Sequence, residues 1–239
     1  MKTLNTSLLF FIFATFFYSC SPKPILEITT LESDKEYYNG SEVVGKSDST
    51  ALVFIEFIEQ NLHQYIFYVQ IENASDKTYL YTGDNNFSKT YHTKERLDND
   101  KYNMMLYAIN PEVKIKEINS NLKSRETSHA ISTGCNCLGG LFSAASSITS
   151  DDENDGTNVS DWIISQEEEN IDYENDMNDL NSEREFWKSE VLRKTTLHPG
   201  DVIGGLVFFK KDIDAKCFKV YINVDTSQFE FLYRQQRVN

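Results

Sequence analysis

Apolar runs with the character of strands lie on both sides of the middle of the chain. Three of them follow the middle, at residues 202–209, 217–224 and 228–233, and in the last two apolar and polar residues alternate. In the second segment, four apolar side chains share one face: Phe218, Val220, Ile222 and Val224. A repeat of two residues is typical of a β-strand that is buried on one side. We therefore expect three strands after residue 201.

The segment before the middle of the chain is rich in the β-branched and aromatic residues that favour strands. Strands are expected at 52–58, 63–71, 78–82, 102–109 and 113–118. The polar stretch 83–101 is expected to be a loop, and Asn110-Pro111 should separate the last two strands because proline cannot donate to a ladder. Seven or eight short strands favour a mainly β fold, an antiparallel immunoglobulin-like β-sandwich whose two halves pair across the middle.

The middle of the chain has the spacing of helices instead. Residues 137–149 predict a helix of small residues, which Gly139-Gly140 weakens. A second helix is indicated by five residues spaced 4, 3, 7 and 4 apart: Tyr173, Met177, Leu180, Trp187 and Val191. Residues 151–190 hold fifteen Asp or Glu and two basic residues. We therefore expect an acidic helical insertion at about 134–194, between strands of the sandwich.

The N-terminus has the order of a secretory signal. One charged residue, Lys2, precedes the uncharged apolar run 8–17, which as a helix would rise only about 15 Å, half of a bilayer core. The following Phe17-Tyr18-Ser19-Cys20 resembles a bacterial lipobox, in which the signal is cut before a cysteine that is then acylated. The alternative is a plain secretory signal followed by an incidental cysteine.

The lipobox resemblance implies a domain layout and a location. Residues 1–19 would be a signal peptide, 20–50 a lipid-anchored tether and 51–239 the sandwich. Cys20 would be the lipid attachment residue, and more than one acyl chain anchors a protein stably. Ser21 after the cysteine resembles the default for Gram-negative outer-membrane retention. The expected location is therefore the bacterial envelope, with the membrane as one partner.

The segment TTLHPGDVIGGLVFF at 195–209 carries the most specific pattern in the chain. It resembles the T-L-x-P-G-x-x-x-x-G-x-V-F signature of immunoglobulin-like, telokin-like sandwich domains of unknown function in bacterial lipoproteins. HQYIFYVQIENASDKTYLY at 63–81 resembles the segment that pairs with it. Pro199-Gly200 suits a turn, and Gly204 or Gly205 would permit a bulge or a close approach. These are folding requirements, and the resemblance implies no catalytic residue.

Candidate site chemistry is sparse. The net charge of −14 argues against a nucleic-acid partner, and no phosphate loop, nucleophile elbow or zinc motif is found. We expect His63, His92, His129 and His198 to be surface residues. The acidic segment 151–156 begins like a calcium loop, but Glu153 and Trp162 occupy ligand positions three and twelve, so a solvated loop is expected. No catalytic residue, cofactor or metal is therefore predicted.

The cysteines after Cys20 leave alternatives open. Cys135 and Cys137 form a C-x-C, which is too short for a redox or zinc C-x-x-C motif. They and Cys217 can be idle thiols, or one of them can form a disulfide with Cys217. Metal binding is the least favoured reading.

The sequence is compatible with three functions. A non-catalytic envelope lipoprotein that binds a protein partner or supports an assembly is favoured because site chemistry is lacking. The alternative is a lipoprotein that binds a glycan or another small ligand, which a concave, exposed aromatic row would support. An envelope hydrolase would need a cleft with converging carboxylates or a Ser–His pair.

Overall fold

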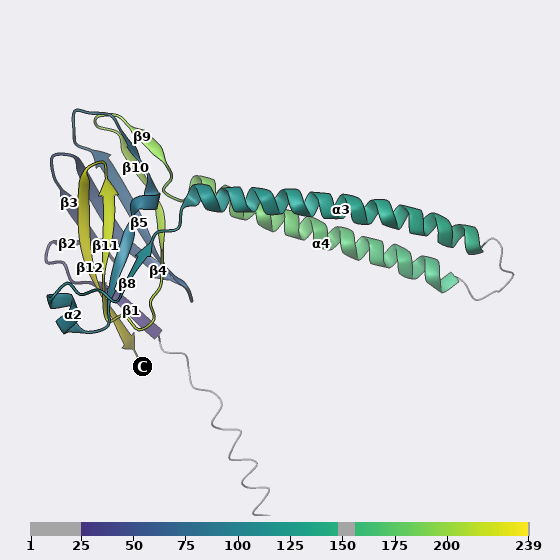
Figure 1. Ribbon diagram of the computed structural model, residues 1–239, viewed down its shortest axis with the longest axis horizontal. Helices are drawn as coiled ribbons and strands as arrows, with labels where there is room; N and C mark the ends of the chain where they lie inside the picture. Colours follow the sequence, from purple (N-terminus) through teal and green to yellow (C-terminus); the bar gives the residue numbers. More distant parts are fainter. Residues whose placement is uncertain (1–24, 148–155, 239) are drawn as a thin grey trace, which may run out of the picture.

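The computed structural model describes residues 25–147 and 156–238, with side chains at 26–132 and 167–238. Ten strands form two antiparallel five-stranded sheets (Figure 1). Sheet A has the order β1 (Ile25–Thr30), β12 (Ser227–Val238), β11 (Cys217–Val224), β7 (Phe87–Tyr91), β8 (Met104–Tyr107). Sheet B has the order β10 (Val202–Lys210), β5 (Gln64–Asn73), β4 (Ala51–Gln60), β3 (Ser41–Ser47), β2 (Lys35–Tyr38).

Shorter elements complete the sandwich. β6 (Tyr79–Tyr81) pairs with β9 (Thr195–Leu197), a 3-10 turn covers Gly83–Asn85, and the short helix α2 covers Lys94–Asp98. β10 pairs with β5, and β11 pairs with β7, so strands from before and after the helices are hydrogen-bonded to each other. The predicted mainly β antiparallel sandwich with a helical insertion is confirmed. The described residues contain twelve strands, more than the seven or eight expected.

The core lies between the two sheets and is largely aromatic. Every second residue of β5 from Tyr65 to Ile71 points inward and is fully buried. Tyr65 stacks on Phe218 of β11 with ring centroids 4.5 Å apart, and Phe67 meets Tyr233 of β12 at 5.0 Å. These rings join the sheets because stacked and tilted aromatic pairs stabilise beyond the area they bury.

The predicted tether at 20–50 is wrong from Ile25 onward. β1, β2 and β3 occupy most of this segment, and Ile25–Thr30 pairs along its whole length with the C-terminal strand β12. β1 and β2 are edge strands of their sheets. Edge strands bury little side-chain surface and are often polar, so they lack the apolar runs by which a strand is predicted from sequence.

The loop predicted at 83–101 contains a strand that lies inside sheet A. β7 pairs with β11 on one side and β8 on the other. Its inward residues are the buried Ser88 and Thr90, opposite Val220 and Phe218, whereas Phe87 lies on the outer side beside Tyr221. The strand therefore reverses the usual placement of polar and apolar residues.

The helical insertion begins earlier than predicted. α3 runs from Pro111 to Ser147 and α4 from Gly156 to Ser189, so the strand expected at 113–118 is the first part of a helix. Pro111 is the first helical residue, a position where its missing N–H costs nothing. The Asn110 side chain accepts hydrogen bonds from the N–H groups of Glu112 and Val113 and caps the helix.

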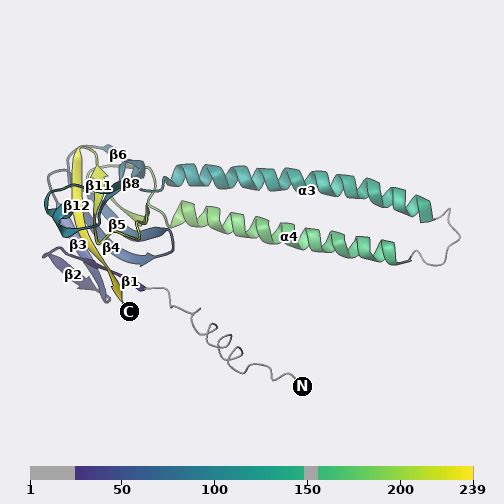
Figure 2. The same ribbon diagram turned by 60° about the horizontal axis from the view of Figure 1, so that its bottom comes forward.

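The two helices lie side by side and leave the sandwich as one long arm, across the strand direction (Figures 1 and 2). The 37 residues of α3 span about 55 Å. The base of the arm packs on the outer face of sheet B. This second cluster of buried residues consists of Ile66, Ile115, Ile118, Leu122, Trp187, Val191 and Phe208.

Polar contacts also fix the base of the arm. Arg193, just after α4, forms a two-point ion pair with Glu112, with both distances 2.9 Å. The chain after α4 runs along β10, where the Leu192 N–H donates to Leu206 O and the Leu206 N–H to Glu190 O. A methyl group at Gly205 would lie 2.7 Å from the Leu192 nitrogen. The close approach expected at Gly204 or Gly205 is thus confirmed at Gly205.

Candidate functional site

Two predicted features lie wholly or largely outside the described residues. They are Cys20 and the acidic segment 151–156, of which the structure describes only Gly156, at the start of α4. Among the described side chains, no three His, Cys, Asp or Glu gather as metal ligands would. None of the described helices combines the length and the apolar character needed to cross a bilayer.

The four histidines are separated from one another and none is buried. His63 is exposed in the β4–β5 turn, and His198 Nδ1 lies 3.1 Å from the Thr78 hydroxyl. His129 stacks on Tyr173 of the arm with ring centroids 3.8 Å apart. His92 contacts a buried carboxylate, Asp212, at 2.9 Å. The structure brings no two histidines together.

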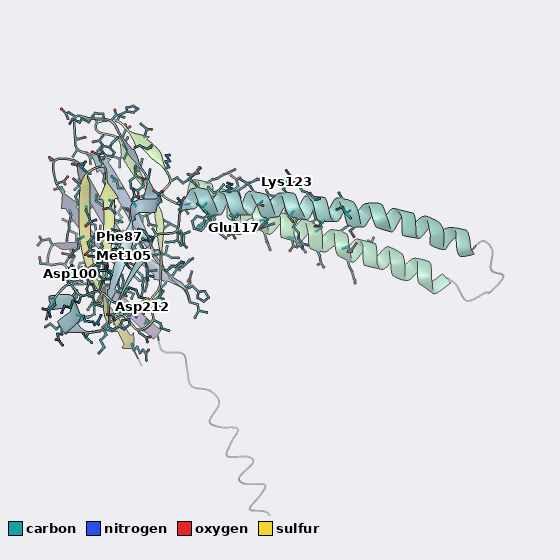
Figure 3. The ribbon with its side chains drawn as sticks, viewed as in Figure 1. Phe87, Asp100, Met105, Glu117, Lys123 and Asp212 are labelled. Carbon is teal, nitrogen blue, oxygen red and sulfur yellow. The ribbon has the colours of Figure 1, made fainter. Side chains whose placement is uncertain are left out.

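Asp212 is the centre of a polar network near the end of the sandwich where the C-terminus lies (Figure 3). Its carboxylate accepts hydrogen bonds from Thr90 Oγ1 at 2.7 Å and from the Asp214 N–H at 3.1 Å, and it contacts His92 Nε2. Burial opposes ionisation, but these contacts outweigh it and hold the pKa of Asp212 below its ordinary value. The network holds the β10–β11 connection in place against the core.

A second carboxylate, Asp100, is tied into the outer face of sheet A (Figure 3). The Tyr91 hydroxyl donates to it at 2.5 Å, and Lys89 and Lys219 each lie 3.7 Å away. The Tyr91 hydrogen bond, followed by the two lysines, lowers the pKa of Asp100. Asp212 and Asp100 therefore both have partners within the fold, and these partners account for their lowered pKa values.

Beyond its base, the described side chains of the arm, at 123–132 and 167–176, meet mainly through polar contacts. Arg125 of α3 forms an ion pair with Asp176 of α4. Farther out, His129 contacts Asn170 at 3.0 Å, and the Ser132 hydroxyl donates to Glu169 at 3.1 Å. Buried apolar residues on α3, by contrast, end at Leu122 within its described side chains. The described outer part of the arm thus adds little buried apolar surface.

The outer part of the arm exposes both charge and apolar side chains. Between residues 167 and 189, α4 carries nine Asp or Glu against Arg184 and Lys188. Ile131 of α3 is 61% exposed and Ile171 of α4 is 58% exposed. The contacts of His129 with Tyr173 and Asn170 put these two isoleucines at the same level of the arm.

The outer face of sheet B has an uncovered aromatic row beside the arm base. We call Tyr38, Phe54 and Tyr68 the aromatic face; they line a depression of about 450 Å³ together with Glu36, Val43, Ile55, Glu56 and Gln70. Tyr38 is 70% exposed and Tyr68 is 39% exposed. This is the concave aromatic row that sequence reasoning associates with a ligand-binding role.

Two glycines let the rings of the aromatic face lie against the sheet. A methyl group at Gly45 would lie 2.7 Å from the Phe54 ring, and one at Gly204 would clash with the Tyr68 hydroxyl. Each ring or hydroxyl therefore occupies the space above a glycine in the neighbouring strand. The sequence signal was the uninterrupted apolar run 65–69, which places apolar residues on both faces of β5.

The cysteine alternatives are settled in part. Cys217 is a free thiol in β11, and burial raises its pKa. A disulfide to Cys217 is therefore absent from the structure. Cys135 and Cys137 lie in α3 at positions whose side chains are outside the described set.

Comparisons with known proteins add no relative. A scan against protein-family models finds no match, and searches of curated proteins and of solved structures also find none. The class defined by the structure is an antiparallel β-sandwich with a long helical arm inserted between β8 and β9.

Proposed function

We propose that this protein is a lipid-anchored bacterial envelope protein that works as a non-catalytic binding or assembly module, with the helical arm as its partner-binding element. The anchor is Cys20, proposed from the lipobox-like sequence before it. The arm is the feature that sets this chain apart from a sandwich alone. We also propose that the sandwich is related to the immunoglobulin-like, telokin-like domains of bacterial lipoproteins that its sequence resembles.

The observation that carries the proposal is the lack of buried apolar side chains in the described outer part of the arm, residues 123–132 and 167–176. The buried cluster at the base of the arm already forms the contact of the arm with sheet B, yet α3 and α4 continue far beyond this cluster. A helix pair with mostly polar contacts gains little stability from its own packing. Exposed Ile131 and Ile171 beside many carboxylates suit a partner with a basic surface and an apolar centre.

A non-catalytic role is supported by the way the described carboxylates are used. Asp212 and Asp100 are each engaged by hydrogen bonds or lysines that stabilise the sandwich. Neither carboxylate lines the depression on sheet B, and each already accepts hydrogen bonds from within the sandwich, whereas a hydrolase would need carboxylates that converge in a cleft.

Site-specific photo-cross-linking in the native host tests the arm. A photoreactive residue replaces Ile131 or Ile171, and the matched control replaces Leu62, an exposed apolar residue of the β4–β5 turn. The proposal predicts one discrete adduct at the arm positions and none at Leu62. The Ile131→Ser, Ile171→Ser double variant should lose co-purification of that partner. Absence of an arm adduct, or equal adducts at Leu62, would contradict the proposal.

The aromatic face favours a second function, binding of a glycan. Rings that lie against a sheet can stack on the apolar face of a sugar, while Glu36, Glu56 and Gln70 beside them can bond to hydroxyl groups. One stacked ring contributes up to about 1.4 kcal/mol, or about tenfold in affinity.

A glycan-array screen followed by calorimetry tests the second function. Tyr68→Ala should weaken binding of the best glycan by about tenfold. The control is Tyr107→Ala, which removes an exposed tyrosine from β8 of the other sheet. No glycan binding by the unaltered chain, or an equal loss in the control, would remove the glycan hypothesis.

A further inference from the structure

A groove of about 940 Å³ lies at the end of the sandwich where the chain enters from the N-terminal side. α2, the β10–β11 connection, and strands β1 and β12 contribute to its walls. Its apolar lining includes Leu26, Leu97 and Ile213. We call it the basic groove because of the charges described next.

Four cations line the basic groove: Lys94, Lys216, Arg234 and Arg237. One carboxylate, Asp214, lines it with them, which leaves a local charge of +3 in a chain whose net charge is −14. Within the described part of the chain none of the four cations forms a salt bridge. Cations that gather without a salt-bridge partner create a local positive potential, which attracts anionic groups.

Exposed apolar residues lie at the same end of the sandwich. Ile213 is 53% exposed and lines the groove, and Val238, at the end of β12, is also exposed. Cations beside exposed aliphatic side chains suit the interface of a membrane, where phosphates and acyl chains meet.

The position of the basic groove also suits contact with a membrane surface. Ile25 pairs with Val238 and Leu26 with Arg237, so the first described residues run beside the groove. Five residue steps separate Cys20 from Ile25, and a fully extended chain covers about 17 Å over five residues. An acylated Cys20 would therefore keep this end of the sandwich close to the membrane.

We propose that the basic groove binds the phosphates of anionic phospholipids in the membrane that holds the anchor. This inference rests on the proposed anchor at Cys20 for its location, but the groove chemistry is independent of it. The acidic α4 leaves the sandwich across the strand direction (Figure 1), and repulsion beyond a Debye length of about 8 Å is largely screened. With the groove end on the membrane, the arm extends sideways over the surface.

Vesicle co-sedimentation of the non-acylated chain from Ser21 tests the groove apart from the anchor. That chain keeps every described strand and helix. Binding is expected to vesicles containing phosphatidylglycerol and not to pure phosphatidylcholine, and it should vanish at about 1 M salt, where the Debye length is about 3 Å.

The variant removes three cations, Lys216→Gln, Arg234→Gln and Arg237→Gln. Each cation at an anionic surface contributes about fivefold, so the partition coefficient should fall by about 100-fold. The control, Lys77→Gln, Lys123→Gln and Lys194→Gln, changes the net charge equally at positions outside the groove. Thermal unfolding confirms that both variants are folded.

Three outcomes would overturn the groove proposal. The first is an equal loss of vesicle binding in the control variant. The second is equal binding to vesicles with and without phosphatidylglycerol. The third is displacement of the protein from vesicles by inorganic phosphate at the concentration of the lipid phosphate, which would indicate a free anion as ligand. Acylation of Cys20 is measured separately by mass. A failed anchor and a failed groove are therefore distinguishable.

Discussion

Asp212 shows how one side chain holds several parts of the sandwich together. Thr90 of β7, His92 after β7 and the turn at Asp214 all reach its carboxylate, which is 5% exposed. The neighbouring Tyr65 hydroxyl donates to the Asp212 backbone carbonyl at 3.0 Å. A charged acceptor in such a place contributes more than a neutral one.

Asp212→Asn should lower the free energy of unfolding by about 1–3 kcal/mol, because partners that the carboxylate satisfied are left unpaired. Urea unfolding at neutral pH measures the change. The control is Asp214→Asn, since Asp214 contributes to the network through its backbone N–H. Equal stability of the Asp212 variant and the parent would show that the network contributes nothing.

The same residue predicts a dependence on pH. The folded-state pKa of Asp212 is below its unfolded value, so its contribution is present above about pH 4 and is lost as the pH falls through the folded pKa. The parent should lose more stability than the Asp212→Asn variant between pH 5 and pH 2. Parallel stability curves for the two proteins, measured by urea unfolding, would contradict this assignment.

At the scale of elements, the base of the arm should contribute much more to the free energy of unfolding than the outer part of the arm. Trp187 packs on Phe208 of β10 with ring centroids 5.0 Å apart. Trp187→Ala should therefore cost about 3–5 kcal/mol of unfolding free energy. Replacing residues 124–175 with a short polar turn keeps the base cluster and should cost far less.

Thermal and urea unfolding compare the two changes. A shortened arm that unfolds the sandwich would mean that the outer helices are part of its core, which contradicts their polar contacts. The shortened protein should also lose co-purification of the partner, because Ile131 and Ile171 are absent from it.

Elements whose inward side chains are apolar could be predicted from the sequence. β5, β10, β11 and β12 lie where the alternating or continuous apolar runs placed them, and Gly200 has the positive φ of 80° expected of the Pro-Gly turn. The α4 stripe is also correct, although Val191 follows the helix and forms a bridge with Leu206.

Elements governed by distant contacts could not be predicted. β7 buries Ser88 and Thr90 because strands on both sides cover it, which no local pattern reveals. The strand expected at 113–118 is instead the start of α3, where Ile115, Ile118 and Leu122 have a helical spacing that the sequence does show. The aromatic face and the basic groove combine residues far apart in the chain, so only the folded structure brings them together.

Charge is separated over the whole molecule. Acidic side chains concentrate on the arm, and the cations of the basic groove lie beside the strand that follows the proposed anchor. A lipid-anchored protein arranged in this way would hold its sandwich against anionic headgroups while its arm reaches a partner. The proposed anchor at Cys20 is the point on which this arrangement depends.

Intact mass of the protein extracted from native membranes tests that point most directly. A lipid-anchored protein is expected to begin at Cys20, to be heavier than residues 20–239 by its acyl chains, and to sediment with the membrane fraction. A soluble chain with an unmodified Cys20, or one cut at another residue, would contradict the lipid-anchored account.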